Sequence, residues 1–124
     1  MAQIDQAVRS LRSSKVLLAD GDANGAMNRL YYALFHAACA ALAYRGITVP
    51  KTHSGLIASF GANFVKSGEV SVELGKLLNQ TEHERLAADY TGDVVDPAGL
   101  PTLIAKGETF IAAMQNLIGP TATT

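Results

Sequence analysis

Residues 23–44 constrain the fold of this 124-residue chain more than any other segment, because they form a long, mostly apolar stretch rich in alanine. Small alanine side chains let neighbouring helices approach closely. Asp22, before the segment, suits a helix N-cap, and Gly46, after it, suits a helix end. We therefore predict a helix over residues 23–44 at the centre of the domain.

Apolar residues that recur at three- and four-residue steps predict four further helices, over about residues 2–19, 52–66, 71–90 and 100–118. Thr52 and Ser71 suit the N-caps of the second and third of these. Residues 81–84, TEHE, also match a capping box, so a break near Gln80 is the alternative to one helix through the fourth segment. No segment alternates as a strand does, and the connections are short. We expect an all-α, up-and-down bundle of four to five helices. Residues 1–118 would form one domain and residues 119–124 a disordered tail.

Composition narrows the function classes. With 48% hydrophobic and 17% charged residues, the chain is typical of a globular protein. Its formal net charge of −1 provides no strong field for nucleic acid or membrane, so RNA contact would need a local basic cluster. No apolar run approaches the roughly 20 residues that span a bilayer, and no signal pattern opens the chain. We expect a soluble cytoplasmic protein. Cys39, the single cysteine, stands among alanines and is predicted to be a buried thiol.

Residues 82–90, EHERLAADY, are the most charged stretch of this otherwise apolar chain. Arg85 and Asp89 stand four residues apart on a predicted helix, which is the spacing of an ion pair. The pair is either a surface salt bridge or a guanidinium that Asp89 orients toward a phosphate. Tyr90 is either a packing residue or a group that donates a proton or stacks on a base.

A second polar group lies on the central helix, where Asn28, Tyr32 and His36 recur every four residues on one stripe, with Arg29 beside it. His36 is either a hydrogen-bonded core residue or a catalytic group. A polar row that is buried or lines a cleft needs partners, and residues 82–90 would supply them.

Two more histidines complete the inventory: His53 is a further candidate at the start of the third helix, and His83 is expected to face solvent. The three histidines lack a close ligand spacing, so we predict no metal site. The chain also lacks a Gly-rich phosphate loop and a nucleophile elbow. The remaining possibilities are side-chain acid–base chemistry, without metal or cofactor, and binding alone.

Four segments in this order resemble the HEPN domain family, small helical proteins often encoded beside minimal nucleotidyltransferases. They are residues 28–38 (NRLYYALFHAA), the Thr52-His53 step, residues 64–68 (FVKSG) and residues 85–90 (RLAADY). The likeness extends over about residues 5–118. It implies a bundle of four to five helices that forms a homodimer, with the helix bearing Arg85 facing its two-fold mate across a cleft.

The resemblance also implies a function. Many HEPN proteins are metal-independent endoribonucleases that act as toxins of toxin–antitoxin systems, with the adjacent nucleotidyltransferase as antitoxin. Their hallmark is an arginine followed, after four to six residues, by a histidine. The histidine helps activate the ribose 2′-hydroxyl for attack on the adjacent phosphate, and the arginine stabilises the developing charge.

This chain departs from that hallmark, because the window after Arg85 holds Asp89, Tyr90 and Thr91 instead of a histidine. Either Tyr90 takes the place of the histidine, or His36 or His53 reaches the cleft from another helix, or ribonuclease activity is absent. In some relatives the partner nucleotidylates a tyrosine beside the hallmark, and Tyr90 is the position here that would take this modification.

Three hypotheses result. The first is a toxin-like protein that cleaves or binds RNA, in which Arg85 contacts phosphate, Asp89 orients Arg85, and Tyr90 or His36 transfers protons. The second is a non-enzymatic module that binds a nucleotide or a nucleotidyltransferase partner through the same cleft. The third treats the polar row as structural, fixing the register of the helices. In the first two, the cleft would be lined by Asn28, Arg29, Tyr32 and His53.

Overall fold

The computed structural model describes residues 2–92 and 94–119, and these residues form helices and connecting loops without strands. The elements in chain order are α1 (Ala2–Ala19), α2 (Ala23–Tyr44), α3 (His53–Phe60), the π-helical turn η1 (Gly61–Val65), α4 (Val72–Thr91), the 3₁₀ turn η2 (Pro97–Gly99) and α5 (Leu100–Ile118). The predicted all-α helical bundle is confirmed.

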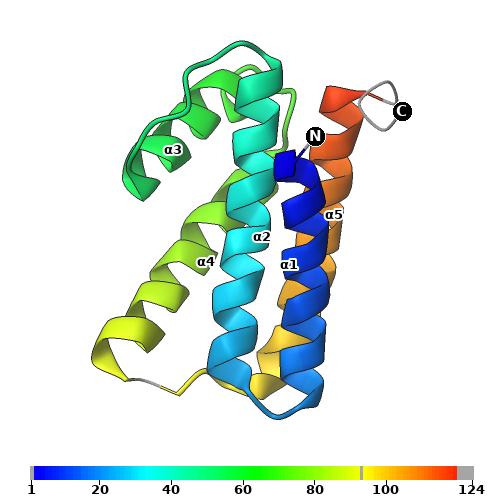
Figure 1. Ribbon diagram of the computed structural model, residues 1–124. Helices are drawn as coiled ribbons and strands as arrows, with labels where there is room; N and C mark the ends of the chain where they lie inside the picture. Colours follow the sequence, from blue (N-terminus) through cyan, green and yellow to red (C-terminus); the bar gives the residue numbers. More distant parts are fainter. Residues whose placement is uncertain (1, 93, 120–124) are drawn as a thin grey trace.

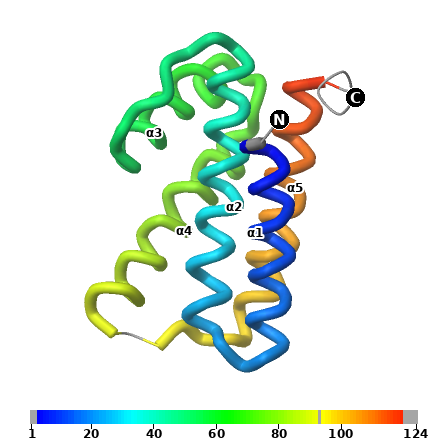
Figure 2. The backbone as a smooth tube through the Cα atoms, viewed as in Figure 1, coloured from blue at the N-terminus to red at the C-terminus, as the bar shows by residue number. Residues whose placement is uncertain are grey.

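Helix α2 is the central element, as predicted, and contacts all four other helices. Figure 1 shows α1 and α5 packed along one side of α2 and α3 and α4 on the other, and Figure 2 shows α1 and α2 running in opposite directions. Asp22 caps α2, because its side chain accepts a hydrogen bond from the backbone N–H of Gly25 at 2.8 Å. The mostly apolar surface of α2 is what allows it to be surrounded.

The side of α2 that faces α1 and α5 is closely packed. The α2 alanines at positions 33, 37 and 38 are fully buried in the core. Ser14 on α1 donates a hydrogen bond of 2.7 Å to the backbone oxygen of Ala26, which satisfies its buried hydroxyl. Burial raises the pKa of the Cys39 thiol to about 11, so this predicted buried cysteine stays protonated at neutral pH.

Helices α3 and α4 form the other side of the bundle. The hydroxyl of Thr52 caps α3 and that of Ser71 caps α4, as predicted, and α4 runs without a break near Gln80. Gly92, in the left-handed conformation with φ +73°, ends α4. In Figure 1, α4 diverges from α2 toward the C-terminal end of α4, and Asp89, Tyr90 and Thr91 in its last turn are exposed.

The expected third helix is confirmed in position, but its last turn differs in kind. The N–H of Lys66 bonds to the oxygen of Gly61, five residues back, which makes residues 61–65 a π-helical turn. Both Phe60 and Phe64 remain buried across this turn.

The predicted disordered tail, residues 119–124, lies outside the described residues except for Gly119. Among the helices that the structure does describe, none combines the length and apolarity needed to cross a bilayer.

Substitution of Gly107 should test the close packing of α5. A Cβ atom at this buried glycine would lie 2.7 Å from Cδ1 of Leu30, a fully buried side chain that would have to shift. We expect Gly107→Val to lower the free energy of unfolding by about 1–3 kcal/mol through overpacking. Gly61→Val is the matched control, because a Cβ there meets nothing within 4 Å. Urea denaturation of both variants measures the difference, and equal stability would contradict this account.

Candidate functional site

Arg85 is the centre of the polar site, and only 8% of its surface is exposed. Its Nε and Nη2 groups donate hydrogen bonds of 3.1 and 2.7 Å to Oε1 of Glu82. Its Nη1 group donates at 3.0 Å to Oδ2 of Asp89, the partner that the i, i+4 spacing predicts. A charge at this burial is costly unless it is paired, and two carboxylates from the same helix pair it.

Two aromatic rings of α2 complete the environment of the guanidinium. Its central carbon lies 4.9 Å from the ring centroid of Tyr31 and 5.4 Å from that of Tyr32, within cation–π range. Burial alone would lower the pKa of Arg85, but the hydrogen bonds and negative charge of Glu82 outweigh it and raise this pKa above its ordinary value. Arg85 is therefore a permanently charged group held in a fixed orientation.

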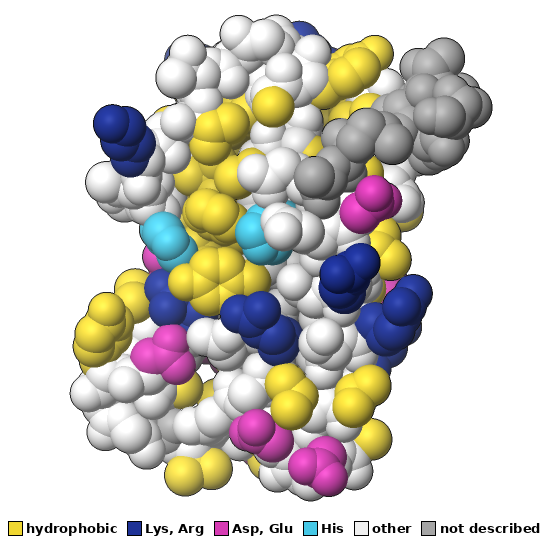
Figure 3. Space-filling view, in the orientation of Figure 1, with side chains coloured by type: hydrophobic (Ala, Val, Ile, Leu, Met, Phe, Trp, Pro, Cys, Tyr) yellow, Lys and Arg dark blue, Asp and Glu magenta, His cyan; other side chains and the backbone are white. Residues whose placement is uncertain are grey.

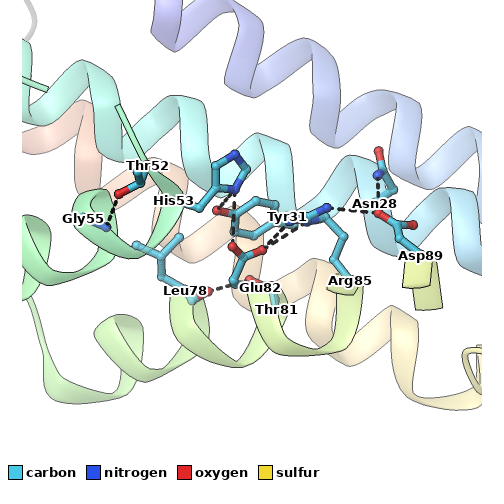
Figure 4. Close-up of polar contacts among 10 residues, drawn as sticks. All are labelled: Asn28, Tyr31, Thr52, His53, Gly55, Leu78, Thr81, Glu82, Arg85 and Asp89. Carbon is cyan, nitrogen blue, oxygen red and sulfur yellow. Dashed lines mark hydrogen bonds and ion pairs between the residues drawn. The ribbon is translucent and has the colours of Figure 1, made fainter. Parts of the chain in front are cut away.

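Glu82 also faces a histidine. Its second oxygen, Oε2, lies 3.3 Å from Nδ1 of His53, at the first residue of α3. The same Nδ1 is 2.9 Å from the hydroxyl oxygen of Tyr31. Figure 4 shows Tyr31, His53, Glu82, Arg85 and Asp89 converging from α2, α3 and α4, and we call these five residues the Arg85 cluster. Burial, with the nearby charge of Glu82, raises the pKa of Tyr31 well above its ordinary value, so this phenol stays protonated.

Asn28 and Arg29 border the cluster at its open end. The Asn28 side-chain amide donates to Oδ2 of Asp89 at 3.5 Å, which links α2 to α4. The Asn28 oxygen accepts hydrogen bonds of 3.1 and 2.8 Å from Arg29, whose guanidinium carbon lies 5.1 Å from the Tyr32 ring centroid. Arg29 therefore places a second cation beside the cluster.

His36 and Tyr90, two residues predicted for the same site, lie apart from the Arg85 cluster. The His36 Nδ1 atom is 2.9 Å from the side-chain oxygen of Gln3, on α1. Phe35 stands between the two histidines, with ring centroids 4.8 Å from His53 and 5.6 Å from His36. Figure 3 shows two histidine side chains on this face, separated by apolar side chains over α2. Tyr90 is 81% exposed near the end of α4.

Tyr31 and Glu82 are the cluster residues that sequence reasoning missed. Glu82 stands three residues before Arg85, so its spacing alone was a signal for an ion pair. Tyr31 lies beside the predicted stripe and gave no such signal. The predicted placement of Asn28, Tyr32, Arg85 and Asp89 against one another is confirmed by their contacts.

The arrangement gathers two guanidinium groups, two carboxylates and an imidazole. Arg29 and Arg85 carry positive charge, and Glu82 and Asp89 carry negative charge. In the described part of the chain, no three histidine, cysteine or acidic side chains are grouped as a metal ion would require. A groove lined by Glu84, Val95, Leu103 and neighbouring residues lies on another side of α4, away from the cluster.

Removing the shared carboxylate should weaken the fold. Glu82→Gln leaves Arg85 buried with one fewer anion and removes the carboxylate that faces His53. We expect a loss of about 1.5–3 kcal/mol in the free energy of unfolding, the usual range for a hydrogen bond to a charged group. Glu69→Gln is the matched control, since Glu69 pairs with Arg45 by a similar contact of 2.7 Å at an exposed position. The control should change stability much less; equal losses in chemical denaturation would refute this difference.

His36 should make stability depend on pH. Burial, together with the charge of Arg29, lowers the pKa of His36 in the folded chain. The unfolded chain, in which a histidine pKa is about 6.5, therefore takes up the proton first as the pH falls. The contribution of neutral His36 is complete above that value and is lost below it. The melting temperature should fall more between pH 7.5 and 5 in the natural protein than in His36→Gln, and equal falls would contradict the assignment.

Comparison with known proteins identifies the family. The model of the HEPN domain matches residues 2–117. A UPF0332 protein of Thermotoga maritima is 39% identical over 110 residues, which cover 87% of this chain and 82% of that protein. Two proteins of Methanocaldococcus jannaschii, each named "Putative toxin", are 33% and 32% identical; the alignments cover 89% and 87% of this chain and 81% and 74% of theirs. The chain belongs to the HEPN domain family.

Proposed function

We propose that this chain is the toxin of a toxin–antitoxin pair and that it acts on RNA, without a metal ion, through the Arg85 cluster. The family and the relatives named as toxins support the first part of this proposal. The second part rests on the geometry of one side chain.

That observation is the fixed guanidinium of Arg85, held by Glu82 and Asp89 over two tyrosine rings. A guanidinium in a set orientation can donate two hydrogen bonds to a phosphate and stabilise charge that develops on it. Asp89, whose side chain is 37% exposed, lies at the accessible end of the cluster, where an incoming phosphate would compete with it for Nη1. Arg29, which bonds to the Asn28 side chain that contacts Asp89, adds a second cation for the RNA backbone.

Cleavage would proceed by attack of a ribose 2′-hydroxyl on the adjacent phosphate, with Arg85 stabilising the charge on the phosphate oxygens. This chemistry needs no metal ion, but it requires a group that accepts the hydroxyl proton. DNA, which lacks the 2′-hydroxyl, would not be a substrate.

A non-enzymatic binding module is the second candidate. The specific observation in its favour is that Nε, Nη1 and Nη2 of Arg85 all already donate to carboxylates. This pairing leaves less of the guanidinium free to stabilise charge on a reacting phosphate, and positions 89–91 hold no histidine, so the site would bind a nucleotide or a nucleotidyltransferase partner without turnover.

The proposed partners follow from family membership. We propose a homodimer, with α4 facing its two-fold mate, and a nucleotidyltransferase as the antitoxin. Tyr90 is the proposed site of modification by that partner, and its exposure of 81% supports access to its hydroxyl.

Replacing Arg85 while keeping its charge tests the proposed function. Arg85→Lys retains the cation but loses the planar fork. A fluorescent single-stranded RNA of mixed sequence, incubated in EDTA, should be cut by the natural protein and roughly 100-fold more slowly by this variant. Arg45→Lys is the matched control, because Arg45 is also paired with a glutamate and lies 5.0 Å from an aromatic ring centroid, that of Phe64, away from the site. Growth arrest on expression in a bacterial host should follow the same order.

Two other outcomes have defined meanings. Binding of RNA without cleavage, with nucleotides raising the melting temperature of the natural protein but not of Arg85→Lys, would select the binding module. Failure to bind or cut RNA, with equal growth in all three strains, would refute action on RNA.

A further inference from the structure

Glu82 joins two groups that differ in chemistry. One oxygen of its carboxylate accepts from Arg85 at 2.7 and 3.1 Å, and the other lies 3.3 Å from Nδ1 of His53. The side chain of Glu82 is only 13% exposed, so its plane is fixed by its neighbours. A single carboxylate therefore sets the position of an imidazole relative to that of the guanidinium.

The ring of His53 is also held by packing. It stacks on Phe35 at 4.8 Å with an interplanar angle of 30°, and on Tyr31 at 5.5 Å with an angle of 24°. Tyr32 meets it edge-on at 5.8 Å. The backbone is fixed as well, because Thr52, the preceding residue, caps α3 through a hydrogen bond of 3.0 Å from the N–H of Gly55. Little rotational freedom remains to the ring.

The hydrogen bonds at Nδ1 decide which form of the neutral imidazole is present. An ionised carboxylate only accepts hydrogen bonds, so the contact of Glu82 with Nδ1 favours the tautomer that carries its hydrogen there. The Tyr31 hydroxyl, 2.9 Å from the same atom, can accept from it in that tautomer or donate to it in the other. In the tautomer that Glu82 favours, the lone pair lies on Nε2. No hydrogen bond to Nε2 is found within the described residues, and in Figure 4 this nitrogen lies on the side of the ring opposite Tyr31 and Glu82. The titratable and charged groups facing the ring are Tyr31 and Tyr32 from α2 and Glu82 and Arg85 from α4.

We propose that His53 is the catalytic base of this protein and that Glu82 positions it, so that a histidine from α3 supplies the proton transfer for which residues 89–91 contain no imidazole. This inference rests on the proposed function. His36 lacks an equivalent arrangement, because its Nδ1 contacts the neutral side chain of Gln3. His83 is exposed on α4.

The reaction balances with water as the only additional reactant. Nε2 of His53 takes the proton of the 2′-hydroxyl while that oxygen forms a bond to the adjacent phosphorus. The bond from phosphorus to the 5′-oxygen of the next nucleotide breaks, and this oxygen takes a proton from water. The products are a 2′,3′-cyclic phosphate and a 5′-hydroxyl, and protonated His53 returns its proton to solvent.

Histidine variants of the full chain test the assignment against a fluorescent single-stranded RNA in EDTA. His53→Asn should cut the RNA about 100-fold more slowly, with unchanged affinity for the RNA, because general base catalysis typically contributes at least this factor. In His53→Ala, added imidazole should restore part of the lost rate, an effect that a purely structural role of His53 would not produce. The cleaved end should resist phosphatase until acid opens the cyclic phosphate. His83→Asn is the matched control, since His83 is exposed on α4, and it should cut at the natural rate.

The remaining outcomes distinguish failure of the His53 assignment from failure of the proposed action on RNA. If His53→Asn and His53→Gln, both folded by circular dichroism, cut as fast as the natural protein while Arg85→Lys does not, the assignment of His53 is wrong and the action on RNA stands. A slow His53→Ala variant that imidazole does not restore would also overturn the assignment, in favour of a structural role. RNA that is bound and never cut excludes a catalytic base and leaves the binding module. If the protein neither binds nor cuts RNA, both the assignment of His53 and the proposed action on RNA are wrong.

Discussion

The burial of one guanidinium determines how α4 can pack on α2. Arg85 is 8% exposed, and a charge so far removed from water is tolerated only when other groups replace its hydration. Two carboxylates on α4 supply acceptors, and Tyr31 and Tyr32 on α2 supply ring faces. These requirements fix the rotation of α4 about its axis, because a helix turned by one residue, about 100°, would carry Arg85 away from the rings and Asp89 away from Asn28.

The two sides of α2 consequently differ in the kind of contacts that they make. The side toward α1 and α5 is closely packed, since a Cβ atom on Gly107 of α5 would lie 2.7 Å from Cδ1 of Leu30. The other side is filled by aromatic rings and ion pairs, with α4 diverging from α2 toward its C-terminal end (Figure 1). Apolar packing of the first kind stabilises the fold directly, whereas each buried charge on the second side is tolerated only because it is paired. The bundle thus has an apolar half and a half in which ion pairs and aromatic rings are concentrated.

The sequence predicted the helices well, because their signals are local. Asp22, Thr52 and Ser71 cap helices as predicted, and Arg85 pairs with Asp89 at the predicted spacing. The grouping across helices was predicted less well. A spacing of eight residues turns a helix by about 80°, so His36 rotates from the line of Asn28 toward α1, whereas Phe35, at about −20°, stays beside the cluster. The prediction that residues spaced by four stay on one face of the helix therefore holds for one step, from Asn28 to Tyr32, and fails over two, from Asn28 to His36. The π-helical turn at residues 61–65 was not predicted either, since one extra residue per turn leaves no mark in the apolar pattern.

The unequal exposure of the two carboxylates decides how the cluster would receive a phosphate. The side chain of Asp89 is 37% exposed and holds Arg85 by one hydrogen bond, whereas Glu82 is 13% exposed and holds it by two. An incoming anion would therefore displace Asp89, whose charge water can solvate, before Glu82, whose charge would be left buried. Loss of the Asp89 contact frees Nη1 while Glu82 still holds the other side of the guanidinium and still faces His53. The same asymmetry that stabilises the resting cluster would thus keep the imidazole oriented after a phosphate had entered.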